Sequence, residues 1–399
     1  MAMERVGQQD VIGLDRLARS LLRVVARSEP AGMVAVHGAP GSGKAEFFRR
    51  LAWLTHSSRS RGEPIPGLHG AVVWFDPWAW SKQGNLLAGL IAAVVRSAPR
   101  PQLHLDRARQ LVSEIQRLRL DGRPAEGPGA AFSGADSDPV DALSDGFAHL
   151  VRGVKESRPG RLLIFVDAVD RLSPELRWQL FDGLRLLLRG GADATAMLCV
   201  GREAALGAVR FHEGDIEERS ALRILEDLVD LSITVPTLDV RRIGTLLREY
   251  LGPAEAAVVS SFGPDAIRAL SAAVAHRPLG SPRFLRRLAL RVALLADYAA
   301  ESRAAREFTE AQWAWVILSV RWPTFRRFMV RGGRVRWEEL RGWLGPRGGS
   351  GRERPTGELG VWLGQDRVLA DYMRLHAQGF SDDVEGIFWL ESLLLASGL

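Results

Sequence analysis

The stretch G-M-V-A-V-H-G-A-P-G-S-G-K-A-E-F-F, residues 32–48, decides the fold of this chain. It reads as a short apolar strand, a glycine-rich turn, a lysine and the start of a helix, which is the order of parts in a P-loop. Gly38, Gly41 and Gly43 allow backbone angles that are closed to residues with a Cβ, so successive N–H groups can converge on a phosphate. The stretch predicts an α/β fold: a parallel sheet flanked by helices, with a phosphate-binding loop.

The lysine after the loop is the most informative residue of this stretch. Only three of the 53 basic residues are lysines (Lys44, Lys82 and Lys155), and Lys44 stands where a phosphate-binding lysine is required. Chance placement is therefore a poor explanation of the motif. The residues predicted to contact the nucleotide are Gly38, Pro40, Gly41, Ser42, Gly43, Lys44 and Ala45.

Ala45 departs from the motif. The position after the lysine is normally Ser or Thr, whose hydroxyl ligates Mg²⁺, and a methyl group cannot do this. Water can fill the empty coordination position, so Ala45 alone does not exclude nucleotide binding. It predicts a weakened metal site.

A second motif, R-L-L-I-F-V-D-A-V-D-R-L-S-P-E, occupies residues 161–175. Its apolar run is typical of a strand buried on both faces of a parallel sheet. An acid at the carboxyl end of such a strand emerges beside the P-loop, where open α/β sheets bind their ligands. Asp167 is therefore the predicted Mg²⁺ ligand, directly or through water, and a candidate catalytic residue.

Two other charged residues are candidates for the same site. The position after Asp167 often carries a second acid that orients the attacking water, but here it is Ala168. Asp170 either takes over that catalytic role or, with Arg171, only caps the helix that begins near Ser173. Both interpretations remain open. Arg202, which follows a short predicted strand at 195–200, is a candidate sensor of the γ-phosphate.

Composition limits the class of protein. With 46% hydrophobic and 25% charged residues the chain has the composition of a soluble globular protein, and no apolar run reaches the roughly 18 residues of a membrane span. The N-terminus has no apolar signal region, and one cysteine excludes an internal disulfide framework, so we expect a cytoplasmic protein. The net charge of +6 comes from arginines interspersed with acids, so nucleic acid is not excluded but not favoured.

Length and pattern predict three regions. Residues 1–236 form the P-loop core, with a flexible insertion at about 120–140 that is rich in Gly, Ala, Pro and Ser. Residues 237–300 form a helical lid, and 301–399 a tryptophan-rich helical region. Seven of the twelve tryptophans lie beyond residue 310. They form either a packed helical core, which we favour because Leu, Val and Ile surround them, or a surface for bases or a partner.

The ordered set of motifs resembles the KAP family of P-loop NTPases. Five segments carry the resemblance: G-A-P-G-S-G-K (38–44), V-V-W-F-D-P-W-A-W (72–80), F-V-D-A-V-D-R-L-S-P-E (165–175), I-L-E-D-L-V-D-L-S-I-T-V-P (224–236) and S-P-R-F-L-R-R (281–287). The resemblance implies an additional-strand P-loop core, a helical lid and ATP as the nucleotide. Members often have membrane helices between the two nucleotide motifs. Because no apolar run of this chain reaches the length of a membrane span, it would be a soluble member. Members act in signalling scaffolds and in phage exclusion.

Three functions follow from these features. The first is an ATP-binding switch within a larger assembly, with slow or absent hydrolysis, because Ala45 and Ala168 remove groups that serve the metal and the attacking water. The second is an active ATPase in phage defence or signalling, with Asp170 as the replacement acid. The third is a pseudo-NTPase scaffold that uses its C-terminal half to bind proteins. Partner proteins and a homo-oligomer are expected, without a named partner.

Overall fold

The computed structural model describes residues 10, 13–27, 32–39, 41–60, 65–82, 84–118, 139–156, 160–189, 191–214, 216–236, 238–263, 266–274, 281–302, 306–344 and 357–397. Pro40 lies outside these residues, as does nearly all of the insertion predicted at 120–140. The chain divides into two compact units, Met1–Pro236 and Thr237–Leu399. Among the described residues, no helix combines the length and the apolar character that crossing a membrane requires.

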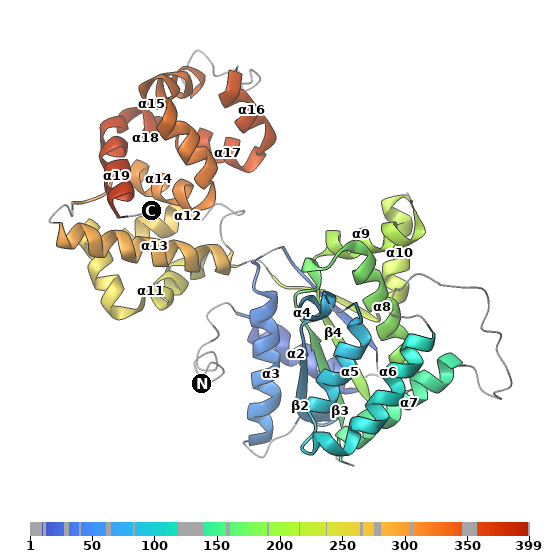
Figure 1. The fold of residues 1–399 in the computed structure, drawn as a ribbon. Helices are drawn as coiled ribbons and strands as arrows, with labels where there is room; N and C mark the ends of the chain where they lie inside the picture. The colour runs from blue at the N-terminus through green and yellow to red at the C-terminus, as the bar shows by residue number, and fades with distance from the viewer. Residues whose placement is uncertain are drawn as a thin grey trace. The chain divides into compact units, whose positions relative to one another are not determined.

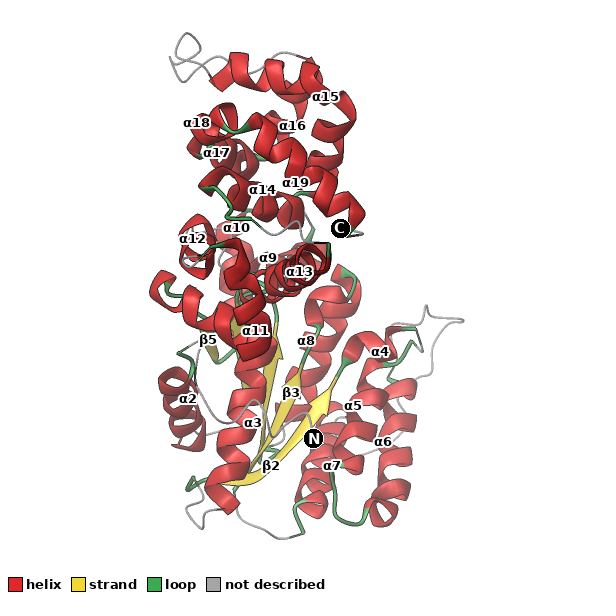
Figure 2. Ribbon diagram, turned by 90° about the vertical axis from the view of Figure 1, so that its left-hand side faces the viewer, coloured by secondary structure: helices red, strands yellow, loops and turns green. Residues whose placement is uncertain are grey.

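The first unit is built on a parallel sheet of five strands, which confirms the predicted α/β class (Figure 2). The strands are β1 (Met33–His37), β2 (Leu68–Phe75), β3 (Arg161–Val166), β4 (Ala194–Cys199) and β5 (Leu231–Thr234). Their order is β2-β3-β4-β1-β5, and all neighbouring pairs are parallel. Strand β4 therefore separates the P-loop strand β1 from the strand β3 that leads to Asp167. This is the additional strand that the resemblance implied.

Helices cover both faces of this sheet, because successive strand residues point to opposite sides. Met33 and Ala35 of β1 join one core cluster, whereas Val34 and Val36 join the other. The second cluster is closed by α2 (Asp15–Arg27) and α3 (Lys44–Ser60). The helices of the first cluster lie on the other side of the sheet (Figure 1): α5 (Leu86–Arg96), α6 (Leu105–Arg117), α7 (Pro139–Val154), α8 (Pro174–Arg189), α9 (Arg202–Glu213) and α10 (Glu218–Leu228).

The segment after β2 shows why its aspartate, proline and tryptophans occur together. Asp76 caps the short helix α4 (Pro77–Ser81): its Oδ1 accepts hydrogen bonds from the N–H of Trp78 at 3.0 Å and of Ala79 at 3.4 Å. The ring of Trp80 lies so close to Gly89 that a Cβ there would be 2.5 Å from Trp80 Cδ2. This motif therefore ends the strand and fixes α4 against α5.

The second unit is helical. Its helices are α11 (Ile243–Val259), α12 (Ala266–Val274), α13 (Pro282–Glu301), α14 (Glu310–Arg321), α15 (Pro323–Leu344), α16 (Gly357–Gln365), α17 (Arg367–Leu375), α18 (Ala377–Asp382) and α19 (Val384–Ala396). Four C-terminal tryptophans are at most 9% exposed, as the core interpretation predicts: Trp313, Trp315, Trp322 and Trp337. Two others, Trp362 and Trp389, are half-buried. The tryptophan cluster is thus mainly the core of this unit.

A buried ion pair lies within that core. Arg326 Nε donates to Glu391 Oε1 at 2.9 Å and Arg326 Nη2 donates to Glu391 Oε2 at 3.0 Å, and each side chain is 7% exposed. The Trp315 indole N–H also donates to Glu391 Oε1. The carboxylate of Glu391, on α19, is thereby satisfied by donors from α14 and α15, and these contacts fix the three helices relative to one another.

Candidate nucleotide-binding site

The P-loop joins β1 to α3 as the sequence predicts, but its glycines serve two different needs. Gly41 (φ 84°) and Gly43 (φ 104°) have left-handed backbone angles that other residues rarely adopt. Gly38 does not have a positive φ. A Cβ there would lie 2.5 Å from Ser42 Oγ, so Gly38 is required for space rather than for its backbone angle. The prediction that all three glycines supply unusual angles was wrong for this one.

The loop has an unsatisfied donor that suits a phosphate. Ser42 Oγ is buried, and it has no hydrogen-bond partner among the described residues. A buried hydroxyl without a partner is costly, and a phosphate oxygen in the loop would satisfy it. Helix α3 begins at Lys44, directly after the loop, so the positive end of its dipole lies at the same place. The residues present therefore fit a nucleotide phosphate.

Lys44 is buried, and its ammonium group already has partners. Lys44 Nζ donates to the carbonyl oxygen of Gly38 at 2.7 Å and of Ala39 at 3.4 Å. It also forms an ion pair with Asp170, with 3.1 Å between Nζ and Oδ2, and the Lys44 side chain is 7% exposed. A buried ammonium needs such a partner because desolvation disfavours its charge. A phosphate that binds Lys44 would compete with Asp170.

Asp170 lies at the P-loop and does not cap α8. Its Oδ1 accepts a hydrogen bond from the N–H of Gly201 at 2.5 Å while its Oδ2 pairs with Lys44. The cap of α8 is Ser173, whose Oγ accepts from the N–H of Leu176 at 3.3 Å. Of the two interpretations left open by the sequence, the structure disfavours the one in which Asp170 is only a helix cap.

Asp167 follows β3 at the carboxyl end of the sheet, at the position expected for a metal ligand. Its Oδ1 accepts a hydrogen bond from the N–H of Ala168 at 2.7 Å, and its carboxylate is close to the thiol of Cys199 at the end of β4. Burial, and the negative charge of Asp167, raise the pKa of Cys199. Ala168 has a left-handed backbone (φ 57°), which is unusual for a residue with a Cβ.

The donors for a magnesium ion are few. Ala45 offers no oxygen from its side chain, and in the described part of the chain no group of three His, Cys, Asp or Glu side chains could hold a metal. Asp167 is the carboxylate that would hold Mg²⁺, with the remaining ligands supplied by nucleotide oxygens and water. The protein therefore fits a nucleotide-bound metal better than a metal alone.

Arg202 and His37 lie near the same site. Arg202 is the first residue of α9 and is exposed, and in the described residues it has no ion pair. His37 ends β1, and its Nδ1 is 3.1 Å from the carbonyl oxygen of Val200. Burial lowers the pKa of His37, and the positive charges of Arg202 and Lys44 lower it further. His37 was not among the residues predicted for the site, although a polar residue in an otherwise apolar buried strand is a signal for one.

The geometry defines a nucleotide-binding P-loop protein. The P-loop, its lysine and the acids that follow β3 meet at the carboxyl end of a parallel sheet with the additional strand. A comparison with known families gives the same answer: the KAP family P-loop domain matches residues 15–299. The chain belongs to the KAP family of P-loop NTPases. A search of curated proteins finds no match.

Proposed function

We propose that this protein binds ATP and uses it as a conformational switch in a larger cytoplasmic assembly, with slow or absent hydrolysis. The observation that carries the proposal is the ion pair between Lys44 and Asp170. Lys44 is the residue that a nucleotide phosphate needs, and in the structure its ammonium group is paired with Asp170. Binding of ATP would therefore release Asp170.

Release of Asp170 is a structural signal because this carboxylate also accepts the N–H of Gly201, the residue directly before α9. Asp170 lies after β3, Lys44 after β1 and Gly201 after β4, so one side chain connects the ends of three neighbouring strands. A change of partner at Lys44 would be transmitted to the start of α9. Such a local change of charge partners is how nucleotide switches bias a mobile element.

Slow hydrolysis is proposed from two alanines. Ala45 lacks the hydroxyl that would ligate Mg²⁺, and Ala168 lacks the carboxylate that would orient water. Phosphoryl transfer depends on positioning and on charge stabilisation, so loss of both groups would cost orders of magnitude in rate. Lys44 remains and would still bind the phosphates, and Asp167 remains and would still hold Mg²⁺, although more weakly.

An active ATPase is the second candidate, and the position of Asp170 favours it. Asp170 Oδ2 lies 3.1 Å from Lys44 Nζ, so a carboxylate lies beside the lysine that would bind the γ-phosphate. The two proposals differ in what Asp170 does after ATP binds. In the switch it moves away from the phosphates, and in the ATPase it positions the water. A scaffold that no longer binds nucleotide is the third candidate.

The test is a titration of a fluorescent ATP analogue with and without Mg²⁺, together with phosphate release, for the wild type and Lys44→Ala. The switch predicts saturable binding that Lys44→Ala abolishes, with little phosphate release. Lys155→Ala is the matched control, because Lys155 is also 7% exposed and ion-paired, but with Asp193 directly before β4, at the opposite end of the strand. Binding that survives Lys44→Ala would refute the proposal, and rapid phosphate release would establish the ATPase instead.

A further inference from the structure

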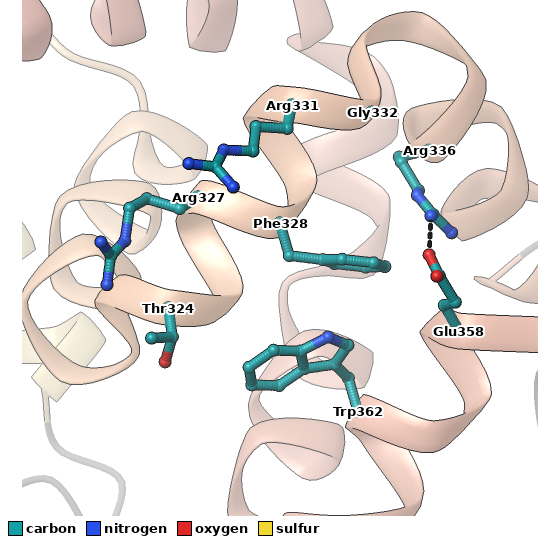
Figure 3. A pocket seen from close by; sticks show the side chains of 8 residues that line it. All are labelled: Thr324, Arg327, Phe328, Arg331, Gly332, Arg336, Glu358 and Trp362. Carbon is teal, nitrogen blue, oxygen red and sulfur yellow. Dashed lines mark hydrogen bonds and ion pairs between the residues drawn. The ribbon is translucent and has the colours of Figure 1, made fainter.

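A pocket of about 430 Å³ opens in the second unit between α15 and α16, and the P-loop has no part in it (Figure 3). One wall is a single face of α15, because Thr324, Arg327, Phe328 and Arg331 follow the spacing i, i+3, i+4, i+7. The other wall includes Trp362 of α16. This size is within the usual range of pockets for small ligands.

Two of the pocket's arginines have no acidic partner in the described part of the chain. Arg327 and Arg331 are exposed, and within the described residues neither side chain forms an ion pair or a hydrogen bond. Like charges four residues apart on a helix repel each other, so their proximity is slightly unfavourable unless an anion lies between them. Arg336, the third arginine of the pocket, is instead neutralised by Glu358 and by Glu339 at 3.2 Å. The uncompensated charge of the pocket is thus on Arg327 and Arg331, which favours an anion.

The middle of the pocket is aromatic. The rings of Phe328 and Trp362 lie 5.8 Å apart at 38° (Figure 3), and the Arg336 guanidinium is 4.2 Å from the centre of the Phe328 ring. Arg336 reaches Phe328 because α15 is kinked at Gly333, where φ is 54° and ψ is −146°. Trp362 is half-buried, and its indole N–H donates no hydrogen bond to a described residue. The pocket therefore offers a planar apolar surface with one free donor.

We propose that this pocket binds a phosphorylated nucleoside, either as a free nucleotide or as a unit of a single-stranded nucleic acid. Arg327 and Arg331 bind the phosphate through charge-assisted hydrogen bonds, and the Trp362 ring stacks against the base. The indole N–H of Trp362 donates to an acceptor on the base or ribose. A phosphotyrosine side chain would use the guanidinium groups and the ring, but apart from its phosphate ester oxygens it has no acceptor to offer this N–H, whereas a base and a ribose do.

The test measures binding of a fluorescein-labelled single-stranded dodecamer to the full chain by anisotropy, with AMP titrated calorimetrically against the Lys44→Ala chain to exclude the P-loop. Arg327→Ala/Arg331→Ala should weaken binding by at least about tenfold. It should also reduce the magnitude of the slope of log K against log salt by about 0.7, because the two guanidinium groups neutralise one phosphate. Trp362→Ala should weaken binding about tenfold, because stacking on one base is lost.

The control variant Arg334→Ala/Arg367→Ala removes the same charge from exposed arginines of this unit that do not line the pocket. It should bind like the wild type, and all variants are compared by thermal unfolding. Binding of the dodecamer identifies nucleic acid as the source, and binding of AMP alone identifies a free nucleotide. The proposal is wrong if the wild type binds neither, if the control loses as much affinity, or if a phosphotyrosine peptide binds more tightly than both.

Discussion

Replacing Asp170 with asparagine tests the switch most directly, because it removes the charge that holds Lys44 and keeps an oxygen for the Gly201 N–H. The pair is 3.1 Å long, with side-chain exposures of 7% and 32%. Exposed ion pairs contribute about 0–1 kcal/mol, whereas breaking a buried pair costs about 3–5 kcal/mol. Because Lys44 is buried and Asp170 is partly exposed, we expect this pair to contribute about 1–2 kcal/mol.

The free energy of the Lys44–Asp170 pair should appear in two measurements, the stability of the protein and its affinity for ATP. Without ATP, Asp170→Asn should lower the free energy of unfolding by about 1–2 kcal/mol, because the pair stabilises the empty folded state. If ATP binding breaks the pair in the wild type, the variant no longer has this cost, so its dissociation constant for ATP should fall by roughly 5- to 30-fold. Urea unfolding gives the first quantity and the ATP titration gives the second.

The matched control is Asp193→Asn, since Asp193 is the acid of the Lys155 pair directly before β4. It should lower stability but leave the affinity for ATP unchanged. Weaker binding of ATP to Asp170→Asn would refute the switch, because Asp170 would then serve the nucleotide-bound state. Loss of phosphate release with unchanged affinity would assign Asp170 the catalytic role.

Three other perturbations have defined outcomes. Ala45→Ser should increase the enhancement of ATP affinity by Mg²⁺ on the order of tenfold, because the hydroxyl is restored at the metal; titrations with and without Mg²⁺ measure it. Burial lowers the pKa of His37 below its ordinary value of 6.5. Below pH 6.5 the unfolded chain therefore binds more protons than the folded protein, so the free energy of unfolding falls as the pH falls, by at most about 1.4 kcal/mol per pH unit. His37→Gln should remove this part of the pH dependence of urea unfolding. Glu391→Leu leaves Arg326 buried without its partner and should cost about 3–5 kcal/mol, whereas Arg326→Met/Glu391→Leu should cost much less, as urea midpoints will show.

The sequence predicted most of the fold because its signals are local. The apolar runs that end at His37 and Asp167 indicate buried parallel strands. The glycine-rich loop with Lys44 indicates that a strand precedes it and a helix follows it. The position of β4 between β1 and β3 came from the family resemblance instead, because local patterns do not determine the order of strands.

The contacts of the site were not predictable because they join distant segments. Lys44 and Asp170 are far apart in the chain, and they meet only because β1 and β3 end at the same edge of the sheet. The left-handed backbone at Ala168, directly before the turn that carries Asp170, is equally hidden, because alanine gives no signal for it. The role of Gly38 was misread for a similar reason: its neighbour Ser42 Oγ is close only once the loop has folded.

Ala45 and Ala168 of the nucleotide site are best interpreted together with Asp170, the partner of Lys44. In hydrolytic P-loop enzymes, a Ser or Thr hydroxyl ligates Mg²⁺ and an acid orients the attacking water in the transition state. Ala45 and Ala168 supply neither group. The proposed switch requires only that the states with and without nucleotide differ in their contacts. Asp170 would provide that difference, since it contacts both Lys44 and the N–H of Gly201 and a phosphate would compete with it for the lysine. ATP can shift the equilibrium between the Asp170-paired and Asp170-released states only by the difference between its affinities for them. The free energy of the Lys44–Asp170 pair, which ATP would have to break, opposes this shift. If the proposed assembly needs a larger shift, a partner would have to bind more tightly to the state in which Asp170 is released, and ATP and that partner would then strengthen each other's binding by the same factor.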